Sequence, residues 1–192
     1  FAGHSWHTAR WNHAVDLTGK RVGVIGTGAS GFQAIQKIAE VAGELTVFQR
    51  SPPWIRPTPG YNSLLKESSR WLFANVPNYH RWFRVYRMWV GMCRRAYTEV
   101  DPSWKHPVSM SQKNEELRQL MMTHLERSLA DRPDLLKKMT PDYPPFAKRC
   151  ASDDGKWFAT LKRPNLRLVS EKITKANKGG IVTANGELHE LD

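Results

Sequence analysis

Apolar and polar positions near the start of this chain follow two different periods, and they predict a strand, a helix and a second strand. Residues 22–25 form a short, mostly β-branched run, which is typical of a parallel strand covered on both faces. Residues 32–42 carry apolar side chains at steps of three and four, which predicts a helix that ends at Gly43. A second strand is predicted at residues 44–48. This order indicates an α/β fold with a parallel sheet.

The pattern changes after the second predicted strand. Four prolines within residues 51–60 remove backbone donors and exclude a helix there. Residues 61–140 show helical periodicity, and one predicted helix in this span runs roughly from Ser111 to Leu129. Its inner side is predicted to carry Leu117, Leu120, Met121, His124 and Leu125, with His124 at the edge of the core. Residues 166–169, which follow a short predicted helix, then favour a strand that returns to the sheet.

These patterns predict a Rossmann-type domain interrupted by a helical insertion of roughly eighty residues. Asn185-Gly186 lies between two short apolar runs, which is a strong signal for a hairpin near the end of the chain. The predicted divisions are a linker at 1–18, the first part of the Rossmann core at 19–60, the helical insertion at 61–140, and the return to the nucleotide-binding domain with its terminal hairpin at 141–192.

Three glycines between the first strand and the first helix have the spacing of a dinucleotide-binding turn. Gly26 permits the tight turn, Gly28 lets the backbone approach a pyrophosphate, and Gly31 lets the helix pack closely against the strand. The N-terminal amides and the positive end of the helix dipole would face the phosphates. The flanking strands favour this interpretation over an ordinary glycine-rich loop. The candidate cofactor-binding residues here are Gly26, Thr27, Gly28, Ala29, Ser30 and Gly31.

The residues after the second strand indicate which dinucleotide is bound. NAD-binding domains usually place Asp or Glu here to accept a hydrogen bond from the ribose 2′-hydroxyl. This chain instead offers Gln49, Arg50 and Ser51. A carboxylate would repel a 2′-phosphate, whereas a guanidinium binds one through two parallel hydrogen bonds. We therefore predict NADPH as the cofactor, with a merely surface-exposed Arg50 as the alternative.

Composition narrows the possible partners. The chain has 29 Lys and Arg against 18 Asp and Glu, a net charge of +11, which suits nucleic acid, an anionic membrane or a phosphorylated ligand. Cys93 and Cys150 are too few for a disulfide framework or a four-cysteine zinc site, so a reducing cytoplasm is expected. His4 and His7 have no carboxylate or cysteine nearby, and no metal site is predicted. No signal peptide opens the chain, and no apolar run of about 18 residues could span a bilayer.

Aromatic and basic residues alternate along the middle of the insertion. Trp82, Tyr86 and Trp89 share one helical face, with arginines over much of the remainder. Such a pattern is compatible with nucleic-acid or membrane-surface binding. We favour an amphipathic helix that buries its aromatic residues in a core, because the chain carries no RNA- or DNA-binding motif. No specific nucleic-acid partner is expected, and peripheral membrane association stays open.

The first eleven residues resemble the fingerprint of the type I Baeyer–Villiger monooxygenases, Phe-x-Gly-x-x-x-His-x-x-x-Trp. The fixed positions are occupied by Phe1, Gly3, His7 and Trp11. In that family the motif links an FAD domain to an NADPH domain that opens with a Rossmann turn, and the same order is found here. Related N- and S-oxygenases usually carry Tyr or Phe at the position of Trp11. Asn12 departs from the Pro or Asp that commonly follows the motif.

The span 144–162 is similar to the region of these enzymes, notably the 4-hydroxyacetophenone type, that carries a Lys-Arg pair. The resemblance implies that Lys148 assists Arg50 at the 2′-phosphate and that Arg149 is the catalytic arginine. Arginine suits the second role because its guanidinium stabilises a nearby anion without giving up a proton. A basic surface pair is the alternative interpretation.

The resemblance implies an FAD- and NADPH-dependent enzyme that inserts one oxygen atom from O₂ into a ketone or aldehyde, giving an ester or lactone. The chain holds only one Gly-x-Gly-x-x-Gly, so we expect the FAD domain to lie outside it and the fragment alone to be inactive. Two alternatives remain: an N-hydroxylating or sulfoxidising flavin-dependent monooxygenase, and a non-enzymatic basic module that binds nucleic acid or a membrane surface.

Overall fold

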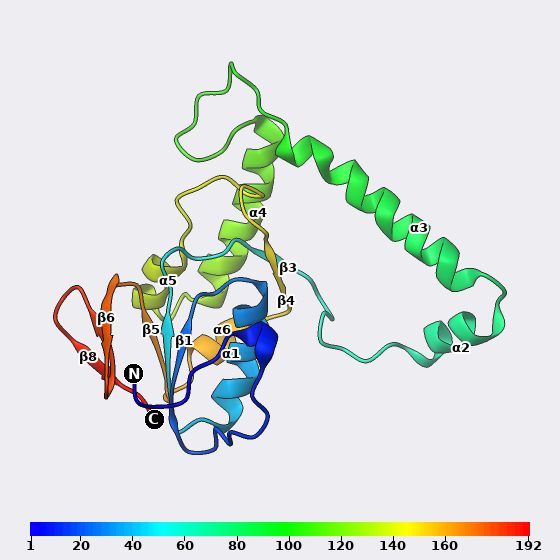
Figure 1. Ribbon diagram of the computed structural model, residues 1–192. Coiled ribbons are helices and arrows are strands. Elements are labelled where there is room, and N and C mark those ends of the chain that lie inside the picture. Colours follow the sequence, from blue (N-terminus) through cyan, green and yellow to red (C-terminus); the bar gives the residue numbers. More distant parts are fainter.

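The computed structural model describes all of residues 1–192, and Figure 1 shows it as a ribbon. It contains a parallel sheet, a second pair of parallel strands, an antiparallel sheet and several helices. In chain order the elements are η1 (Thr8–Arg10), β1 (Arg21–Ile25), α1 (Ala29–Val41), β2 (Glu44–Phe48), β3 (Ile55–Pro57), α2 (Glu67–Asn75), α3 (Tyr79–Met92), η2 (Cys93–Thr98), α4 (Gln112–Ser128), α5 (Pro133–Met139), β4 (Ala151–Asp153), α6 (Lys156–Leu161), β5 (Leu166–Val169), β6 (Ile173–Asn177), β7 (Gly180–Thr183) and β8 (Leu188–Glu190).

The parallel sheet has the strand order β1-β2-β5, so the predicted α/β fold is confirmed. One face of the sheet is covered by α1 and α6, with α5 and the end of α4 completing the main core. Phe32 of α1 stacks on Trp157 of α6 with ring centroids 4.3 Å apart, and both side chains are buried. The 3.6-residue pattern of α1 therefore places its apolar side against the strands, as expected for an amphipathic helix.

The antiparallel sheet β6-β7-β8 supplies the cover for the other face of the parallel sheet. Side chains alternate across β2, so that Val47 joins the main core while Phe48 packs with Val169 and Ile181. The predicted hairpin at Asn185-Gly186 is confirmed, because β7 and β8 pair antiparallel on either side of it. Covering layers on both faces explain why Val47 and Phe48, the last two residues of β2, are both apolar and buried.

The pairing of β3 with β4 was not predicted. These three-residue strands are parallel, with Ile55 beside Ala151 and Arg56 beside Ser152. The prolines next to β3 indicate an irregular connector rather than a strand. The remaining backbone groups of this segment nevertheless form hydrogen bonds with a strand almost a hundred residues away. The pair fastens the loop after β2 to the residues that follow Lys148 and Arg149.

The insertion is largely helical, as predicted, and α4 begins at Ser111, whose hydroxyl accepts a hydrogen bond from the Asn114 amide. Three of the residues expected on its inner side, Leu117, Met121 and Leu125, are buried. Leu120 is 53% exposed, which corrects that part of the prediction. His124 lies half-buried with its ring against Phe158, at the edge of the core as expected.

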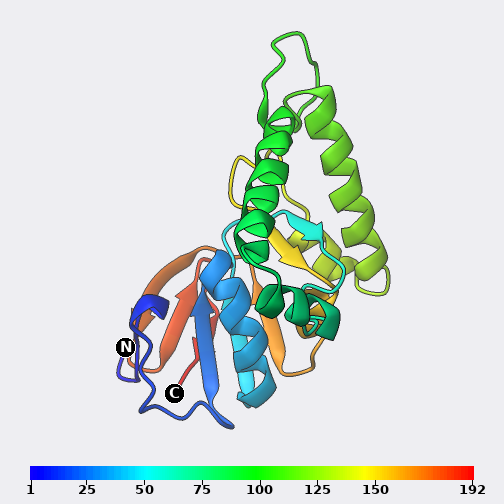
Figure 2. The ribbon, with the colours of Figure 1, turned by 90° about the vertical axis from the view of Figure 1, so that its right-hand side faces the viewer.

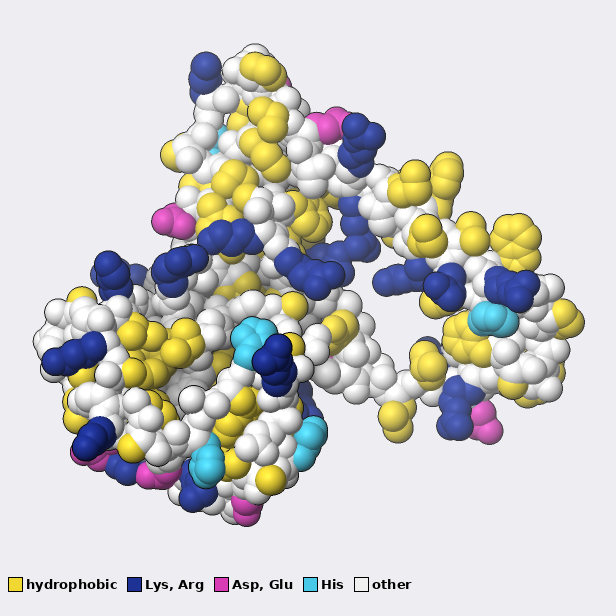
Figure 3. All heavy atoms as spheres, in the orientation of Figure 1, with side chains coloured by type: hydrophobic (Ala, Val, Ile, Leu, Met, Phe, Trp, Pro, Cys, Tyr) yellow, Lys and Arg dark blue, Asp and Glu magenta, His cyan; other side chains and the backbone are white.

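Helices α2 and α3 form an arm that stands away from the rest of the molecule (Figures 1 and 2). The expectation that its aromatic residues enter a core of this chain is wrong: Trp82, Tyr86 and Trp89 are 70%, 60% and 66% exposed. Figure 3 shows hydrophobic side chains on the outer side of the arm and Lys or Arg on the side that faces the sheet. Helical periodicity identifies an apolar face but not what covers it. None of the helices has the length and apolar character needed to cross a membrane.

A partly buried ion pair on α4 makes the stability of the insertion pH-dependent. Arg118 donates two hydrogen bonds, of 2.7 and 2.8 Å, to the carboxylate of Glu115, whose side chain is 12% exposed. This guanidinium lowers the pKa of Glu115 from 4.5 to about 2. Because the folded-state pKa is lowered, the ionised carboxylate stabilises the fold above pH 4.5, and that contribution is lost as the pH falls toward 2.

We expect Arg118→Met to lower the free energy of unfolding by about 1–3 kcal/mol at pH 7, because it removes a charge-assisted pair. The difference from the unmodified protein should shrink between pH 5 and pH 2, as measured by urea unfolding. Arg127→Met on the same helix is the control, since Arg127 is exposed and forms no ion pair. A difference that stayed constant across this pH range would contradict the assignment.

Candidate functional site

The candidate site lies where β1 and β2 end side by side. The two strands are parallel and in register, with Ile25 beside Phe48, so the loops that follow them leave the same edge of the sheet. A hydrogen bond of 2.8 Å from the Gly26 amide to the Phe48 carbonyl continues the pairing beyond the strands. This carboxyl edge of a parallel sheet is where α/β proteins bind their ligands.

Each glycine of the turn has a distinct environment. Gly26 has a φ of +96°, a conformation that favours glycine. A Cβ on Gly31 would collide with the carbonyl oxygen of Gly26, so the close contact between helix and turn requires glycine at position 31. A Cβ on Gly28 would meet nothing within 4 Å, so this backbone is open to a ligand at the N-terminal end of α1. These are the features that the dinucleotide motif requires.

Gln49 has a different environment from its neighbours in the predicted ribose site. It is 2% exposed, its Nε2 donates to the Lys138 carbonyl at 3.0 Å, and its Oε1 accepts from the Thr27 hydroxyl at 3.2 Å. The side chains of Gln49 and Thr27 thus bond within the protein, and Thr27 is buried as well. Gln49 therefore ties the glycine-rich turn to the end of α5. Its backbone lies at the edge of the sheet, while its side-chain amide points into the protein.

Three predicted residues gather beside this turn. Arg50 and Ser51 directly follow β2, and the Lys148 ammonium donates to the Ser51 hydroxyl at 2.8 Å. No ion pair involves Arg50 or Lys148. Both side chains are exposed, so two uncompensated positive charges and a hydroxyl are presented to solvent where β2 ends.

The loop that carries Lys148 is fastened to the connector after β2. The Trp54 indole donates to the Tyr143 carbonyl at 2.7 Å, and the Tyr143 hydroxyl donates to the Pro52 carbonyl at 2.7 Å. Asn114, which is fully buried, donates from its side chain to the Pro145 carbonyl at 3.0 Å. Nothing in the sequence indicated these anchors beyond the aromatic character of Trp54 and Tyr143.

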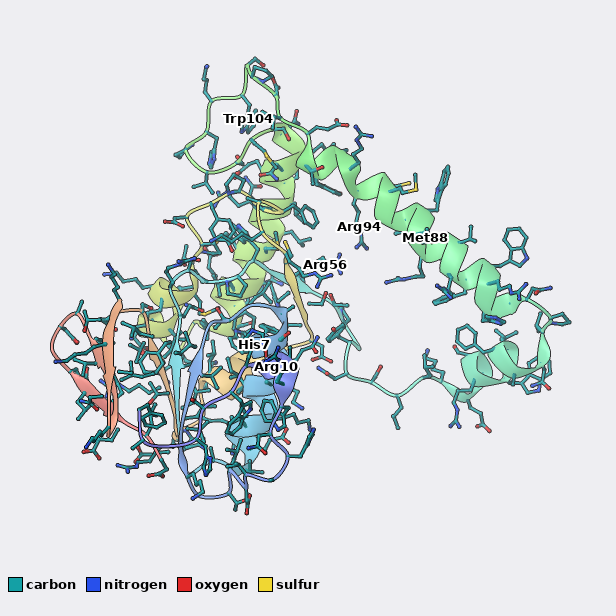
Figure 4. The ribbon with its side chains drawn as sticks, in the orientation of Figure 1. His7, Arg10, Arg56, Met88, Arg94 and Trp104 are labelled. Atoms are coloured by element: carbon teal, nitrogen blue, oxygen red, sulfur yellow. The ribbon has the colours of Figure 1, made fainter.

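Arg149 stands between Lys148 and β4, is exposed and forms no ion pair. A second group of cations that the sequence did not indicate lies nearby on the arm-facing side. Arg56 of β3 and Arg94 of η2 point toward one another (Figure 4). Burial lowers the pKa of Arg56, and the charges of Arg94 and Arg87 lower it further.

The fingerprint linker borders the glycine-rich turn. A cavity of about 830 Å³ is lined by linker residues, including Phe1, His7 and Trp11, and by Gly26, Gly28 and the first turn of α1. His7 Nδ1 accepts a hydrogen bond from the Ala9 amide and begins η1, and Trp11 packs against the main core. The linker therefore forms one wall of the cavity. No group of three or more His, Cys, Asp or Glu side chains in residues 1–192 could hold a metal ion.

The chain is similar over its full length to one segment of several monooxygenases. It is 38% identical over 194 residues to an uncharacterized monooxygenase of Sinorhizobium fredii and covers 29% of that protein. It is 32% identical over 192 residues to a Baeyer–Villiger monooxygenase of Pseudomonas aeruginosa and covers 34% of it. The chain thus spans about a third of the length of these relatives. No family model matches the sequence.

Comparison of the fold with solved structures identifies the same group of proteins. The structure of OTEMO in complex with FAD and NADP superposes on the whole chain with a TM-score of 0.73 and 28% identity, and the match covers 41% of that protein. The resemblance to type I Baeyer–Villiger monooxygenases is therefore confirmed in both sequence and fold. The 4-hydroxyacetophenone-like subtype stays a prediction, and so do the individual site residues.

Substitution of Gly31 and of Gly28 should separate the stability of the turn from its ability to bind a nucleotide. Gly31→Ala should lower the free energy of unfolding by about 1–3 kcal/mol, because the new Cβ must displace the Gly26 carbonyl. Gly28→Ala should leave stability within about 0.5 kcal/mol, since φ at Gly28 is −65° and its surroundings are open. It should nevertheless weaken NADPH binding by at least about tenfold, because the methyl group occupies the close approach to the pyrophosphate. Urea unfolding and NADPH titration measure the two quantities. Equal stability losses would contradict this assignment.

Proposed function

We propose, starting from the relationship of this chain to type I Baeyer–Villiger monooxygenases, that it is the NADPH-binding part of such an enzyme. The turn at Gly26–Gly31 would hold the pyrophosphate, and the domain divisions predicted from the sequence would apply. Support comes from the open backbone at Gly28, the exposed start of α1 and the cavity beside them. The two cysteines are free thiols, which suits work in a reducing cytoplasm.

One observation carries the choice of NADPH: Lys148 reaches Ser51 from a loop 97 residues away, directly beside Arg50. A 2′-phosphate bound there would meet a guanidinium, an ammonium and a hydroxyl, all of them hydrogen-bond donors. No carboxylate is paired with either cation, so their charges are available to an anion. NADH lacks the phosphate and would leave the two cations without a partner.

The proposal includes a flavin held outside this segment, since the chain covers only about a third of the length of its relatives. FAD, when bound and reduced by NADPH, would activate O₂ so that one of its oxygen atoms is inserted into a ketone or aldehyde. The role of this chain is to bind and orient the nicotinamide cofactor and to present Arg149. Because a guanidinium does not give up its proton, Arg149 stabilises negative charge on a nearby oxygen atom and does not protonate it.

Cofactor preference tests the 2′-phosphate site. In the enzyme that contains this segment, Arg50→Ala should raise KM for NADPH by about 10- to 100-fold, because one charge-assisted hydrogen-bond pair is lost. KM for NADH should change little. Arg70→Ala, which removes an arginine from the distant arm, is the matched control. An unchanged ratio of kcat/KM between NADPH and NADH would remove Arg50 from the site.

Removal of the Arg149 guanidinium should separate NADPH consumption from product formation. Arg149→Ala should leave NADPH binding within about threefold of normal, because Lys148 and Arg50 remain, yet it should lower the yield of ester at least about tenfold. Reducing equivalents from NADPH should then appear as hydrogen peroxide. Lys148→Ala should show the reverse pattern, with weakened NADPH binding and nearly normal ester yield per NADPH. Ester formation by Arg149→Ala at the normal rate would show that Arg149 is only surface charge.

A further inference from the structure

Tyr143, in the loop that carries Lys148, is held by hydrogen bonds at its backbone and at its hydroxyl. Its backbone carbonyl accepts from the Trp54 indole and its hydroxyl donates to the Pro52 carbonyl, each at 2.7 Å. The Trp54 and Tyr143 rings also pack edge to face, with centroids 6.5 Å apart. The ring of Tyr143 is thus fixed at both ends to residues 52–54, immediately after the predicted 2′-phosphate site.

The ammonium group of Lys148 lies over this fixed ring, 4.2 Å from its centroid. It also donates to the Ser51 hydroxyl at 2.8 Å. A flexible four-carbon side chain on an exposed loop would otherwise sample many rotamers, and ordering it costs conformational entropy. The ring face attracts the cation and limits that freedom.

The chemical nature of these two partners matters for what Lys148 can bind. A carboxylate would also hold the ammonium group, but it would neutralise the charge. A ring face and a hydroxyl are both uncharged, and no ion pair involves Lys148. The full positive charge is therefore kept beside Arg50 and remains open to an anion.

We propose that Tyr143 is a positioning residue that determines cofactor specificity: its ring holds the Lys148 ammonium, with its charge intact, at the place where the 2′-phosphate of NADPH binds. The proposal rests on the function proposed above and adds a residue to it. Tyr143 acts through Lys148 and does not itself contact the phosphate. Its hydroxyl anchors the ring, and its ring face attracts the cation.

The experiment compares Tyr143→Leu, Tyr143→Phe and Lys148→Ala, with the double variant, in the FAD-loaded enzyme that contains this segment. Tyr143→Leu removes the ring and should raise KM for NADPH about 3- to 30-fold, with KM for NADH unchanged. Tyr143→Phe keeps the ring and should restore NADPH use to within about threefold of normal. The double variant should match Lys148→Ala alone, because a residue that acts through Lys148 has no effect once that side chain is gone.

A merely structural role for Tyr143 gives a different pattern. KM values for NADPH and NADH would then rise together, and the losses of the two single variants would multiply in the double variant. Either result would overturn the proposal. If Tyr143→Leu does not fold, fluorinated phenylalanines at position 143 preserve the shape and progressively weaken the negative ring face. KM for NADPH should then rise with fluorine content, whereas the same series at Phe83, an exposed residue of α3, should have no effect. A flat series at position 143 would also overturn it.

Failure of the proposed function would be visible in the unmodified enzyme. That protein would show no preference for NADPH over NADH, and both conclusions would fall together. A clear NADPH preference that survives Tyr143→Leu would remove only the role of Tyr143.

Discussion

The in-register parallel pairing of β1 and β2 is the constraint on which the site depends. Because Ile25 and Phe48 end their strands side by side, the glycine-rich turn and the Gln49–Ser51 segment leave the sheet at one place. Gln49 then locks the arrangement from inside, since its buried amide reaches both Thr27 and the end of α5. A shift of the pairing by one residue would exchange the faces to which Val47 and Phe48 point and remove each side chain from its own core.

The local parts of this site could be predicted from the sequence because local patterns determine them. The apolar run, the three glycines and the following helix lie within twenty-five residues, and their periods correspond directly to β1, α1 and β2. The placement of Lys148 beside Arg50 was inferred only from a family resemblance, and its contact with Ser51 was not predicted. Its physical causes, the Tyr143 anchor and the β3–β4 pair, join segments about ninety residues apart, and no periodicity carries that information.

Burial was harder to predict than secondary structure, as two cases show. Gln49 is a predicted cofactor-binding residue whose side chain lies buried within the protein, whereas Trp82 and Trp89 were expected in a core and are exposed. In each case the residue type indicates a preference, but the surrounding elements decide the outcome. A buried amide is stable when both its donor and its acceptor are used, as in Gln49. An aromatic face remains open when no element of the same chain reaches it.

Lys148 and Arg149 are adjacent in one loop, and their proposed roles in cofactor binding and in catalysis require their side chains to lie in different places. The chain enters β4 at Ala151, two residues after Arg149. Lys148 is drawn toward Ser51 by the hydroxyl and the Tyr143 ring, so Arg149 is free to point elsewhere. The β3–β4 pair fixes the following backbone, which limits how far either residue can move relative to the end of β2. One anchored loop can therefore bring a cofactor-selecting cation and a catalytic cation to nearby but separate places, and the proposed roles of Lys148 and Arg149 require that separation.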